Sequence, residues 1–503
     1  MKINSICIVG GGSSGWMMAL ALNKKLPNLD VTLIESPDVK PIGVGESTIP
    51  YTANFFVDVL GLKEKEWMPR CNATYKASIK FNDFYKKGET FYHPFWTKDE
   101  GTYNGYDWAI KQYLTNLNKP DNMNYYSSSY IAYHMSKHNK FDRLNDESFS
   151  YAHHMDANKF GEYCKTKFEG KHILSNVKHV KVNGSTIVSV TTEKETIEAD
   201  MFVDCTGFKA LLIGKALHEP FVSYKNTLLN DTALTCQIEY TNKKTQIEPY
   251  TDCTALSSGW AWNIPLWHRV GSGYVFSSKF QTLESAKKEY KKYLKNRFGS
   301  DSLKNIKFNT IKIKTGKYKR GWVGNCLSLT LASGFIEPLE STGLALACYQ
   351  IKEFVETISN YEYSSFNKSL YNNDLDKTYN EIHNFVLLHY INTTREDSEY
   401  WSYLKNNIDV PNSVHSYLNE DASKSTWFPE KSKECITIGL NIPSKYKPSK
   451  LSWNNIRLQS YTKKDQAFIL YDLKYIEERE KYYENKIKTM SNLTEYLNNN
   501  IYI

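Results

Sequence analysis

The beginning of the chain carries two short apolar runs separated by a glycine-rich turn. Ile3–Val9 is largely apolar, as a buried strand is, and Asp30–Glu35 is a second run of the same kind. Between them, the residues from Trp16 to Lys25 have the pattern of a helix. A strand, a helix and a strand in this order predict a parallel sheet of the α/β class.

The following part alternates predicted helices and strands around an irregular insertion. Helices are expected at Tyr51–Leu60, Glu64–Met68, His153–Phe168 and Thr282–Phe298, and strands at Cys71–Phe84, Ile173–Val177, Ile187–Val190, Met201–Val203 and within residues 231–280. Alternating Thr, Tyr, Val and Trp indicate the strands of the last range. Residues 85–150 are rich in Tyr, Gly, Asn and Asp, which predicts an irregular insertion.

The last part of the chain is mostly helical by its pattern. Apolar residues at helical spacing predict a buried helix over Thr342–Ile358. Helices rich in Lys and Asn are expected from residue 359 onward, ending in a charged amphipathic helix over Asp472–Leu497. We therefore expect two units, residues 1–358 with the insertion at about 85–150, and a helical subdomain over residues 359–503.

The turn after the first strand fits a dinucleotide-binding fingerprint. Gly10–Gly15 reads GxGxxG, and Glu35 closes the second strand 20 residues after Gly15. Such glycines allow a tight turn and a close approach of a pyrophosphate to the helix N-terminus, and the acid binds a ribose hydroxyl. A purely structural glycine turn is the alternative. Because Ala199–Gly207 resembles the late strand of two-dinucleotide flavoproteins, FAD is favoured over NAD.

Charge and cysteine content narrow the class of protein. The net charge is +8, from 63 basic and 55 acidic residues, and only eight of the basic residues are Arg. Arg is the usual reader of bases and phosphates, so nucleic acid is not an expected partner. The nine Cys include no CxxC pair, so no metal is expected, and a reduced, cytoplasmic thiol set fits best. Apolar runs such as Trp16–Leu22 are too short to span a membrane.

Three segments then resemble one enzyme family. Gly43–Pro50 (GVGESTIP) is similar to the flavin strap of the flavin-dependent tryptophan halogenases. Trp260–Pro265 (WAWNIP) matches the WxWxIP motif of that family, and Phe335–Gly343 (FIEPLESTG) matches its second signature. The resemblance covers about residues 3–405. It implies a FAD-binding Rossmann-like module of the two-dinucleotide flavoprotein type, with an inserted β-sheet region and a helical C-terminal subdomain that completes the substrate pocket.

The resemblance also implies a reaction and a set of cofactor contacts. Reduced FAD from a separate flavin reductase, with oxygen and a halide ion, would make hypohalous acid that halogenates an electron-rich aromatic substrate. A homo-oligomer is expected. The residues that would contact FAD are Gly10, Gly12, Ser13, Ser14, Gly15, Glu35, Ser36, Gly45, Ser47, Val177 and Leu331. For the last two, plain core packing is an equal alternative.

Lys76 is the expected halogen-delivering residue. By strand periodicity, Lys76, Ser78 and Lys80 share one face, so periodicity alone favours a solvated lysine face. The resemblance instead makes Lys76 the reactive lysine, whose amine holds hypohalous acid or becomes a haloamine. A desolvated lysine with a lowered pKa would perform this step better.

Glu340, Thr342 and Gly343 complete the expected reaction site. Glu340 would orient the halogenating species and take the proton from the ring, the alternative being a carboxylate that favours the helix start. Thr342 and Gly343 open the predicted buried helix, and the family binds halide there. The alternative is helix capping by Ser341 or Thr342.

A tryptophan pair is the expected barrier between flavin and substrate. Trp260 and Trp262 alternate with a small residue, so both indoles point to one face of a strand. By resemblance they keep organic substrate away from the flavin, together with Ile264 and Pro265. Ordinary core packing is the alternative.

Two other functions stay open. A flavin monooxygenase or other flavin oxidoreductase acting on an aromatic substrate is the main alternative. A non-catalytic flavin-binding protein is the other, although such a scaffold needs neither Lys76 nor Glu340. The pair His153 and His154 is expected to serve packing or the surface, because neighbours on a helix do not face one metal.

The substrate pocket departs from the family pattern. His93 and Phe95 match the early residues that flank an indole. The region Trp427–Pro443 lacks the paired tyrosines with which family members hold free tryptophan, and Trp427 and Phe428 are its only aromatic residues. We therefore expect a small, neutral, electron-rich aromatic, such as a substituted indole or phenol, to be a better substrate than tryptophan.

Overall fold

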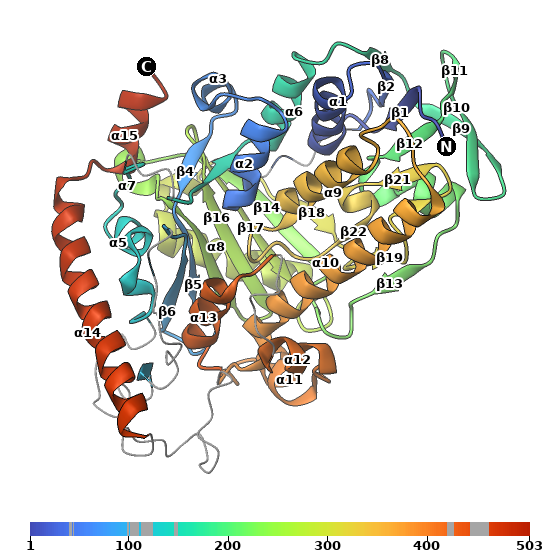
Figure 1. Cartoon of the computed structure of the whole chain (residues 1–503). Coiled ribbons are helices and arrows are strands. Elements are labelled where there is room, and N and C mark those ends of the chain that lie inside the picture. The colour runs from blue at the N-terminus through green and yellow to red at the C-terminus, as the bar shows by residue number, and fades with distance from the viewer. Residues whose placement is uncertain are drawn as a thin grey trace.

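Two large sheets lie side by side and organise the molecule (Figure 1). The computed structural model describes residues 1–39, 43, 45–97, 100, 110–111, 124–144, 149–419, 427–442 and 462–503. The first sheet has six strands in the order β20-β21-β12-β1-β2-β8. Their bounds are β1 Ser5–Val9, β2 Asp30–Glu35, β8 Lys171–Leu174, β12 Met201–Asp204, β20 Trp322–Val323 and β21 Cys326–Ser328.

The first sheet is mainly parallel and confirms the predicted α/β class. β1 runs parallel to β2 and to β12, with Val9 opposite both Ile34 and Asp204. Both neighbours therefore end at the same edge as β1. Helix α1 (Ser13–Lys25) buries its whole apolar segment and packs against α6 (Ala157–Lys165) and α9 (Gly343–Thr357). It begins at Ser13, three residues before the predicted start, because the glycine turn leads directly into the helix.

The second sheet has seven strands in the order β18-β14-β17-β16-β15-β5-β6. Their bounds are β5 Ser78–Asn82, β6 Thr90–Pro94, β14 Thr232–Ile238, β15 Tyr250–Leu256, β16 Gly259–Pro265, β17 Val270–Phe276 and β18 Asn309–Lys312. This confirms the strands predicted within residues 231–280. Helix α8 (Leu283–Phe298) follows β17, as predicted, and its buried face joins a core cluster with residues of β14, β16 and β17.

Three small sheets connect these parts. They are β3-β7-β4 (Glu46–Ser47, Ala152–Met155, Thr74–Lys76), β9-β10-β11 (Val177–Asn183, Thr186–Thr192, Thr196–Glu198) and β13-β19-β22 (Phe221–Ser223, Gly316–Tyr318, Gly334–Phe335). The sheet β3-β7-β4 joins the predicted flavin strap to the strand of Lys76, because β7 pairs with both.

Helices make up the C-terminal part, as predicted. They are α10 Ser365–Ile391, α11 Glu399–Asn407, α12 Asn412–Asn419, α13 Glu430–Gly439, α14 Lys463–Lys486 and α15 Leu493–Asn500. Earlier helices are α2 Pro50–Asp58, α3 Glu64–Arg70, α5 Ile131–Lys137 and α7 Lys243–Gln246, with short 3₁₀ or π turns at Ser127–Ser129, Gly207–Lys209, Leu211–Ala216, Asp301–Leu303, Thr330–Ala332 and Ile487–Thr489. None of the described helices is both long and apolar enough to cross a membrane.

Two predicted elements differ from the structure: one helix begins later than predicted, and one strand is interrupted in its middle. The helix expected at His153–Phe168 begins only at Ala157, because Asp156 accepts hydrogen bonds from the N–H groups of Asn158 and Lys159 and so starts the helix there. Its first residues form β7 instead. The strand expected at Cys71–Phe84 is interrupted at Ala77, so that β4 and β5 belong to different sheets.

Three further predictions are corrected in extent. The described part of the insertion 85–150 is not irregular throughout, since it contains β6 and α5; residues 98–99, 101–109, 112–123 and 145–148 of it lie outside the described residues. Five strands, β8 to β12, replace the three expected before Asp204. The helix expected at Asp472–Leu497 is two helices, because α14 ends at Lys486 and Asn492 caps α15.

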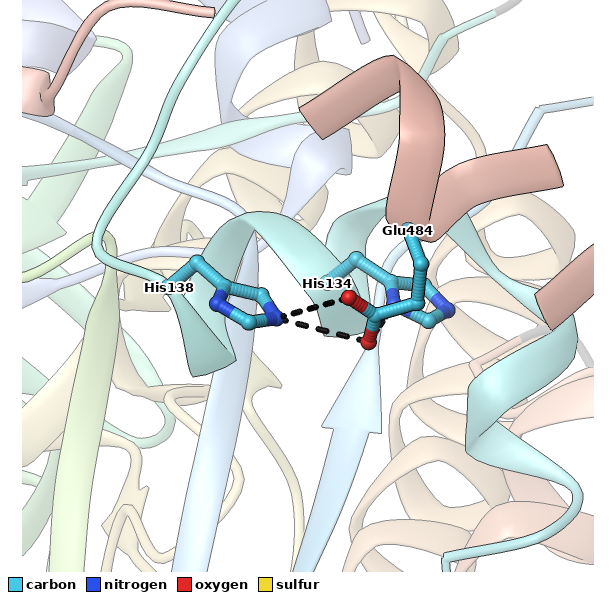
Figure 2. A group of neighbouring side chains, drawn as sticks. All are labelled: His134, His138 and Glu484. Atoms are coloured by element: carbon cyan, nitrogen blue, oxygen red, sulfur yellow. Dashed lines mark hydrogen bonds and ion pairs between the residues drawn. The ribbon is translucent and has the colours of Figure 1, made fainter. Parts of the chain in front are cut away.

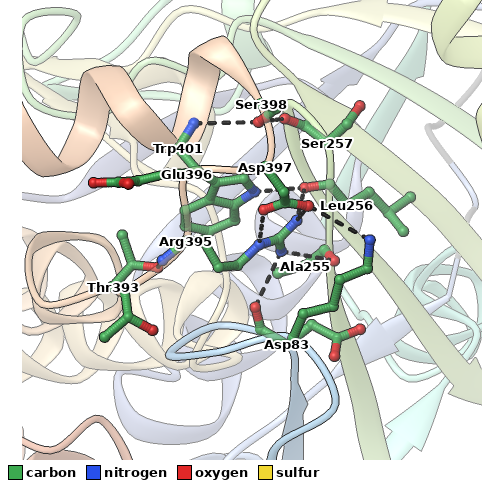
Figure 3. A network of polar contacts seen from close by, with 12 residues as sticks. Asp83, Ala255, Leu256, Ser257, Thr393, Arg395, Glu396, Asp397, Ser398 and Trp401 are labelled. Carbon is green, nitrogen blue, oxygen red and sulfur yellow. Dashed lines mark hydrogen bonds and ion pairs between the residues drawn. The ribbon is translucent and has the colours of Figure 1, made fainter.

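The segment after α10 is anchored by a buried arginine (Figure 3). The Arg395 guanidinium donates hydrogen bonds to the carbonyls of Asp83 and Ala255, and its Nε lies 2.8 Å from Oδ1 of Asp397. The indole of Trp401 donates to the carbonyl of Leu256 at 2.7 Å. These bonds tie the segment after α10 to the β5–β6 turn and to the end of β15, and so help to fix the helix that carries His389.

Candidate active site

The glycine-rich turn has no room for a side chain at its first position. Gly10 has a φ of +121°, which L-residues rarely adopt, and a Cβ there would lie 2.2 Å from the carbonyl oxygen of Cys205. A Cβ on Gly15 would lie 1.9 Å from the carbonyl oxygen of Gly10. The turn therefore packs closely against both α1 and the end of β12.

In contrast to Gly10 and Gly15, the position of Gly12 in the turn has free space around it. A Cβ on Gly12 would meet no protein atom within 4 Å. Gly12 is the N-cap of α1, no side chain caps the helix there, and its first turn holds no acidic residue. The first backbone N–H groups of α1 are available to an anion, so the turn fits the pyrophosphate of a dinucleotide. Ser14 places its hydroxyl 3.1 Å from that of Thr330, beside Leu331.

Glu35 and Ser36 lie at the end of β2, where a ribose contact is expected. Oε2 of Glu35 is 3.1 Å from Nζ of Lys165 and 3.0 Å from Nε2 of His172. The Ser36 hydroxyl donates to Oδ1 of Asn176, the neighbour of Val177. The structure thus brings Val177 to the same edge as Ser36, and its side chain also packs in a core cluster, so both predicted roles stay open.

The carboxylate of Asp204 is hydrogen-bonded to residues of the loop that follows it. It is fully buried and accepts hydrogen bonds from the hydroxyl of Thr206 and from the backbone N–H groups of Thr206, Leu212 and Ile213. Burial raises its pKa. This aspartate therefore shapes the loop beside the glycine-rich turn.

Lys76 is completely buried, so the solvated face that periodicity alone favours is wrong for this residue. It ends β4, and its Nζ donates to the carbonyl of Thr48 at 2.8 Å and to the hydroxyl of Ser341 at 2.9 Å. The same Nζ lies 5.3 Å from the ring centre of Phe95. Lys76 therefore sits between the predicted flavin strap, the second signature and the predicted substrate ring.

Burial changes the acid–base chemistry of Lys76. Desolvation lowers its pKa from 10.5 to about 7, although the charge of Glu340 works in the opposite direction. A large fraction of the side chain is then the neutral amine at neutral pH. Only the neutral amine has the lone pair that a nucleophilic nitrogen needs.

Glu340 is held between two histidines. Its Oε2 lies 2.9 Å from Nδ1 of His93, and its Oε1 lies 2.9 Å from Nε2 of His389. Burial works to raise the pKa of Glu340, but the two histidines together lower it to about 2. The carboxylate is buried yet charged, and its position is fixed from both sides.

A chain of buried hydroxyls leads away from Lys76. Ser341 accepts from Lys76 and donates to Ser47 at 3.0 Å, and Ser47 lies 2.6 Å from the hydroxyl of Thr251. Nε2 of His154 lies 3.0 Å from the same hydroxyl. Burial, with a contribution from Lys76, lowers the pKa of His154 well below its usual value, so the ring is a neutral acceptor that can end the chain.

The tryptophan pair lies on one face of β16, as predicted. The ring centres of Trp260 and Trp262 are 5.7 Å apart with a tilt of 54°. The indole N–H of Trp260 donates to Oε2 of Glu337 at 2.8 Å, so the second signature fixes this ring. A Cβ on Gly45 would lie 3.7 Å from Ile264, which places the strap against the same motif; Val44 of the strap lies outside the described residues.

Thr342 and Gly343 lie at the start of α9. Thr342 is the N-cap, but no side chain caps the helix, and the hydroxyl of Ser341 is used by Lys76 and Ser47. A Cβ on Gly343 would meet only Pro338, at 3.9 Å. The capping alternative is therefore wrong, and the helix start offers free backbone donors to an anion.

A small pocket opens onto Glu340. Its volume is about 150 Å³. It is lined by Ile49, Pro50, Tyr51, Ile79, His93, Phe95, Trp96, Ser150, Glu340, Trp427, Phe428, Pro429 and Ser432. Pro443 of the region with no paired tyrosines lies outside the described residues. A larger surface hollow beside α3, of about 570 Å³, contains none of the predicted residues.

Several residues of this site escaped the sequence analysis. His389 and Ser432 contact Glu340 and His93, and Thr251 extends the hydroxyl chain. His154, which was expected only to pack or to face the surface, lies on β7 and ends that chain. His389 lies in an apolar helical run, where a single polar residue is the available signal. Thr251 has no such signal in an alternating strand, because its partners are distant in sequence.

The fold and this site define a flavin-dependent enzyme of the α/β class with a buried lysine–carboxylate centre. The family model for tryptophan halogenases matches residues 5–453, and the chain belongs to this family of flavin-dependent halogenases. It is 33% identical over 430 residues to tryptophan 6-halogenase SttH of Streptomyces toxytricini, covering 79% of this chain and 80% of that protein. It is 34% identical over 424 residues to tryptophan 7-halogenase RebH of Lentzea aerocolonigenes, covering 80% and 78%.

Solved structures of related proteins superpose on this structure over nearly the whole chain. The apo structure of VirX1 superposes with a TM-score of 0.86 at 33% identity, covering 100% of this chain and 99% of the other. Tar14, a tryptophan C-6 flavin-dependent chlorinase from taromycin biosynthesis, gives a TM-score of 0.85 at 31% identity, covering 98% and 99%. The predicted family, its flavin-dependent fold and the enzyme class are thereby confirmed, and membership implies the use of FAD and halide.

Proposed function

We propose that this enzyme uses FAD and halide to halogenate a neutral, electron-rich aromatic ring, with Lys76 delivering the halogen and Glu340 positioning it. The observation that carries the assignment is the buried amine of Lys76, which lies 5.3 Å from the ring centre of Phe95 at the pocket wall. The monooxygenase alternative has no use for an amine in this place.

The cofactor end of the chain fits a dinucleotide. The free space at Gly12, the uncapped start of α1 and the acid Glu35 at the end of β2 support this fit. The chemistry supplied by bound reduced FAD, with oxygen and halide, is the formation of hypohalous acid. Thr342 and Gly343 would hold the halide at the start of α9, and a separate flavin reductase would supply reduced cofactor.

The neutral form of Lys76 carries the transfer step. Its nitrogen takes the halogen from hypohalous acid, and water leaves, so that an N–halogen bond replaces an N–H bond. The substrate ring then donates an electron pair to the halogen, and the N–halogen pair returns to nitrogen. The nitrogen recovers a proton as the ring carbon loses one, and the amine is restored. The depressed pKa of Lys76, at about 7, keeps the necessary lone pair available near neutral pH.

Glu340 acts mainly as a fixed negative charge. Held by His93 and His389, with its pKa lowered to about 2, the carboxylate is a weak base at neutral pH. It stabilises positive charge that develops on the ring and on the halogen during transfer.

The pocket favours a neutral ring over an amino acid. An engineered apolar cavity of about 150 Å³ accommodates one benzene ring, so the present pocket of about 150 Å³ suits a small aromatic. Its lining among the described residues includes no Lys or Arg. The carboxylate of tryptophan would be desolvated there without a cationic partner, which costs several kcal/mol.

We further propose that residues 359–503 complete this pocket as a helical subdomain. Trp427, Phe428 and Ser432 line it, and α13 packs against β6, the strand of His93. Ser432 places its hydroxyl 3.0 Å from Nε2 of His93. A homo-oligomer is part of the same proposal, to be tested by light scattering.

One experiment tests the proposal. The purified enzyme, a flavin reductase, NADH and FAD are supplied with tryptophan, substituted indoles and phenols, each with chloride, bromide or iodide, and products are measured by mass spectrometry. Halogenated neutral aromatics, with tryptophan converted at least about tenfold more slowly, are expected from the cost of the unpaired charge. Hydroxylated products that need no halide would establish the monooxygenase. Tryptophan halogenated at one position with a micromolar KM would overturn the substrate assignment.

A further inference from the structure

A group of two histidines and a glutamate lies outside the active site (Figure 2). His134 is in α5, His138 follows the helix one turn later, and Glu484 belongs to α14. The three side chains offer ligand atoms that all lie within 4.8 Å of one another. The site therefore bridges the insertion before residue 150 and the C-terminal helices.

The hydrogen bonds of His134 leave one lone pair directed at a carboxylate. His134 is fully buried, and its Nε2 lies 2.9 Å from the carbonyl oxygen of Ser128, so Nε2 carries the proton of that bond. In the neutral ring, Nδ1 is then an acceptor, and it lies 3.2 Å from Oε1 of Glu484. Two acceptors face one another, and a cation between them would satisfy both.

The spacing of the group suits a transition-metal ion. Nε2 of His138 lies 3.4 Å from Oε1 of Glu484, the same oxygen that Nδ1 of His134 approaches. Ligand bonds of 2.0–2.2 Å in a tetrahedron place neighbouring ligand atoms roughly 3.3–3.5 Å apart, close to both nitrogen–oxygen distances. A carbonyl that accepts from the far nitrogen of a ligating histidine is also the usual way in which such a ring is oriented.

We propose that His134, His138 and Glu484 form a binding site for a divalent transition-metal ion such as Zn²⁺. Nδ1 of His134, Nε2 of His138 and the carboxylate would be the ligands, and water would take the remaining position. Imidazole and carboxylate ligands together suit Zn²⁺ and its first-row neighbours better than Mg²⁺ or Ca²⁺.

Lys137 competes with the ion for the carboxylate. Its Nζ lies 3.8 Å from Oε1 of Glu484, and its side chain is 40% exposed, so it can turn into solvent when a metal binds. A positive charge at this distance weakens the binding of a cation. Removal of that charge should therefore strengthen metal binding, although it removes an ion pair.

The place of the three side chains between α5 and α14 indicates a structural role for a bound metal ion. α5 packs on β5 and β6, and the hydroxyl of Ser136 lies 2.6 Å from that of Ser78 in β5. α14 packs on α5 and on the short turn that precedes it. A metal shared by α5 and α14 would hold the C-terminal helix against the strands that carry the active site, without touching its reacting groups.

Metal titration of the full-length chain tests the site. The protein, freed of its affinity tag and dialysed against EDTA, is titrated with Zn²⁺ by calorimetry and with Co²⁺ by visible absorption. One equivalent should bind, the Co²⁺ spectrum should lack thiolate bands, and the Tm should rise with metal. His138→Gln and Glu484→Gln should each weaken binding at least tenfold, and their partly exposed positions keep the fold intact. His179→Gln, at an exposed histidine of β9, is the matched control and should bind as the parent does.

Lys137→Gln provides the decisive second measurement. Metal affinity should rise several-fold in this variant if the carboxylate is a ligand. Absence of binding by the parent chain, binding that survives in His138→Gln and Glu484→Gln, or an affinity lowered in Lys137→Gln would each overturn the proposal and leave a simple ion-pair cluster.

Discussion

The glycine-rich turn and the Lys76 centre are built in opposite ways. The turn is formed by neighbouring residues between β1 and α1, and its contacts with distant segments include those with Cys205 and Thr330. Its donors are backbone N–H groups at an uncapped helix start. The Lys76 centre combines side chains from β4, β6, the segment before α9, and α10, and all of them are buried.

This difference teaches where each site is vulnerable. The turn depends on empty space, because a Cβ would collide with protein at Gly10 and Gly15, whereas a Cβ at Gly12 would meet no protein atom within 4 Å. The Lys76 centre depends on charge, because an amine with a lowered pKa and a carboxylate with a lowered pKa are both buried in it. A substitution that changes only the volume of a residue should affect the glycine-rich turn. A substitution that changes only its charge should affect the Lys76 centre.

The largest expected effect separates the two sites completely. Lys76→Met keeps the length of the side chain but removes the amine, so halogenation should fall more than 10³-fold, the scale for losing a nucleophile. Flavin affinity should change less than about twofold, because Lys76 contacts no residue of the glycine-rich turn and meets the flavin strap through the backbone carbonyl of Thr48. Product formation is followed by mass spectrometry, and flavin binding by quenching of its fluorescence.

Lys80→Met is the matched control for that variant. Lys80 is half-exposed on β5 and shares the predicted face of Lys76, but it lies in a different sheet. It should retain activity. Product formed by Lys76→Met at the rate of the parent would remove Lys76 from the reaction.

The second effect tests charge against shape. Glu340→Gln is isosteric, so the fold should survive, while turnover should fall about 10²-fold because a buried electrostatic partner is lost. KM should change little if the carboxylate acts mainly on the transfer step. A variant that is active but unstable would show that Glu340 serves the fold.

The same contrast explains how much could be predicted from the sequence. The strand–helix–strand order and the place of Glu35 at the end of β2 are local features, so spacing alone predicts where they lie. The burial of Lys76 could not be predicted by periodicity, because the chain bends at Ala77 and the next sheet begins there. His389 was missed because its partner Glu340 is brought beside it only by packing of α10.

Element ends and the proposed metal site show the same limit of prediction from sequence. The helix predicted from His153 fails because β3 and β4 pair with β7, and pairing between distant strands outweighs local pattern. Spacing of cysteines predicts no metal, whereas His134 and Glu484 meet only through the packing of α5 on α14.

The third effect is on stability and follows from the pKa of Lys76. Folding lowers this pKa from 10.5 to about 7, so between these values the unfolded chain binds more protons than the folded one. Stability should therefore rise with pH through this window, by ~2 kcal/mol between pH 7 and pH 9 for this group. Lys76→Met should lack that component and be more stable at pH 7. Urea unfolding of both chains at the two pH values measures the difference, and equal pH slopes would show that Lys76 is not desolvated.

The smallest expected effect is that of filling the free space at Gly12 in the glycine-rich turn. Gly12→Ala places a methyl group where no protein atom lies within 4 Å, and Gly12 has an ordinary extended φ of −73°. The fold should therefore survive, with a loss of stability of at most about 1 kcal/mol, because Ala is a poorer N-cap residue than Gly. If the pyrophosphate of FAD lies at this helix start, the methyl group displaces it, and flavin affinity should fall roughly tenfold, which corresponds to about 1.4 kcal/mol. Gly10→Ala is the contrasting variant, because its methyl group meets the carbonyl of Cys205, and it should therefore lower the Tm in addition to the flavin affinity.

Both variants are measured by flavin fluorescence and by thermal unfolding. Gly12→Ala with full flavin affinity would show that the dinucleotide does not approach this turn, and a low Tm would show that the space at Gly12 is needed by the protein itself.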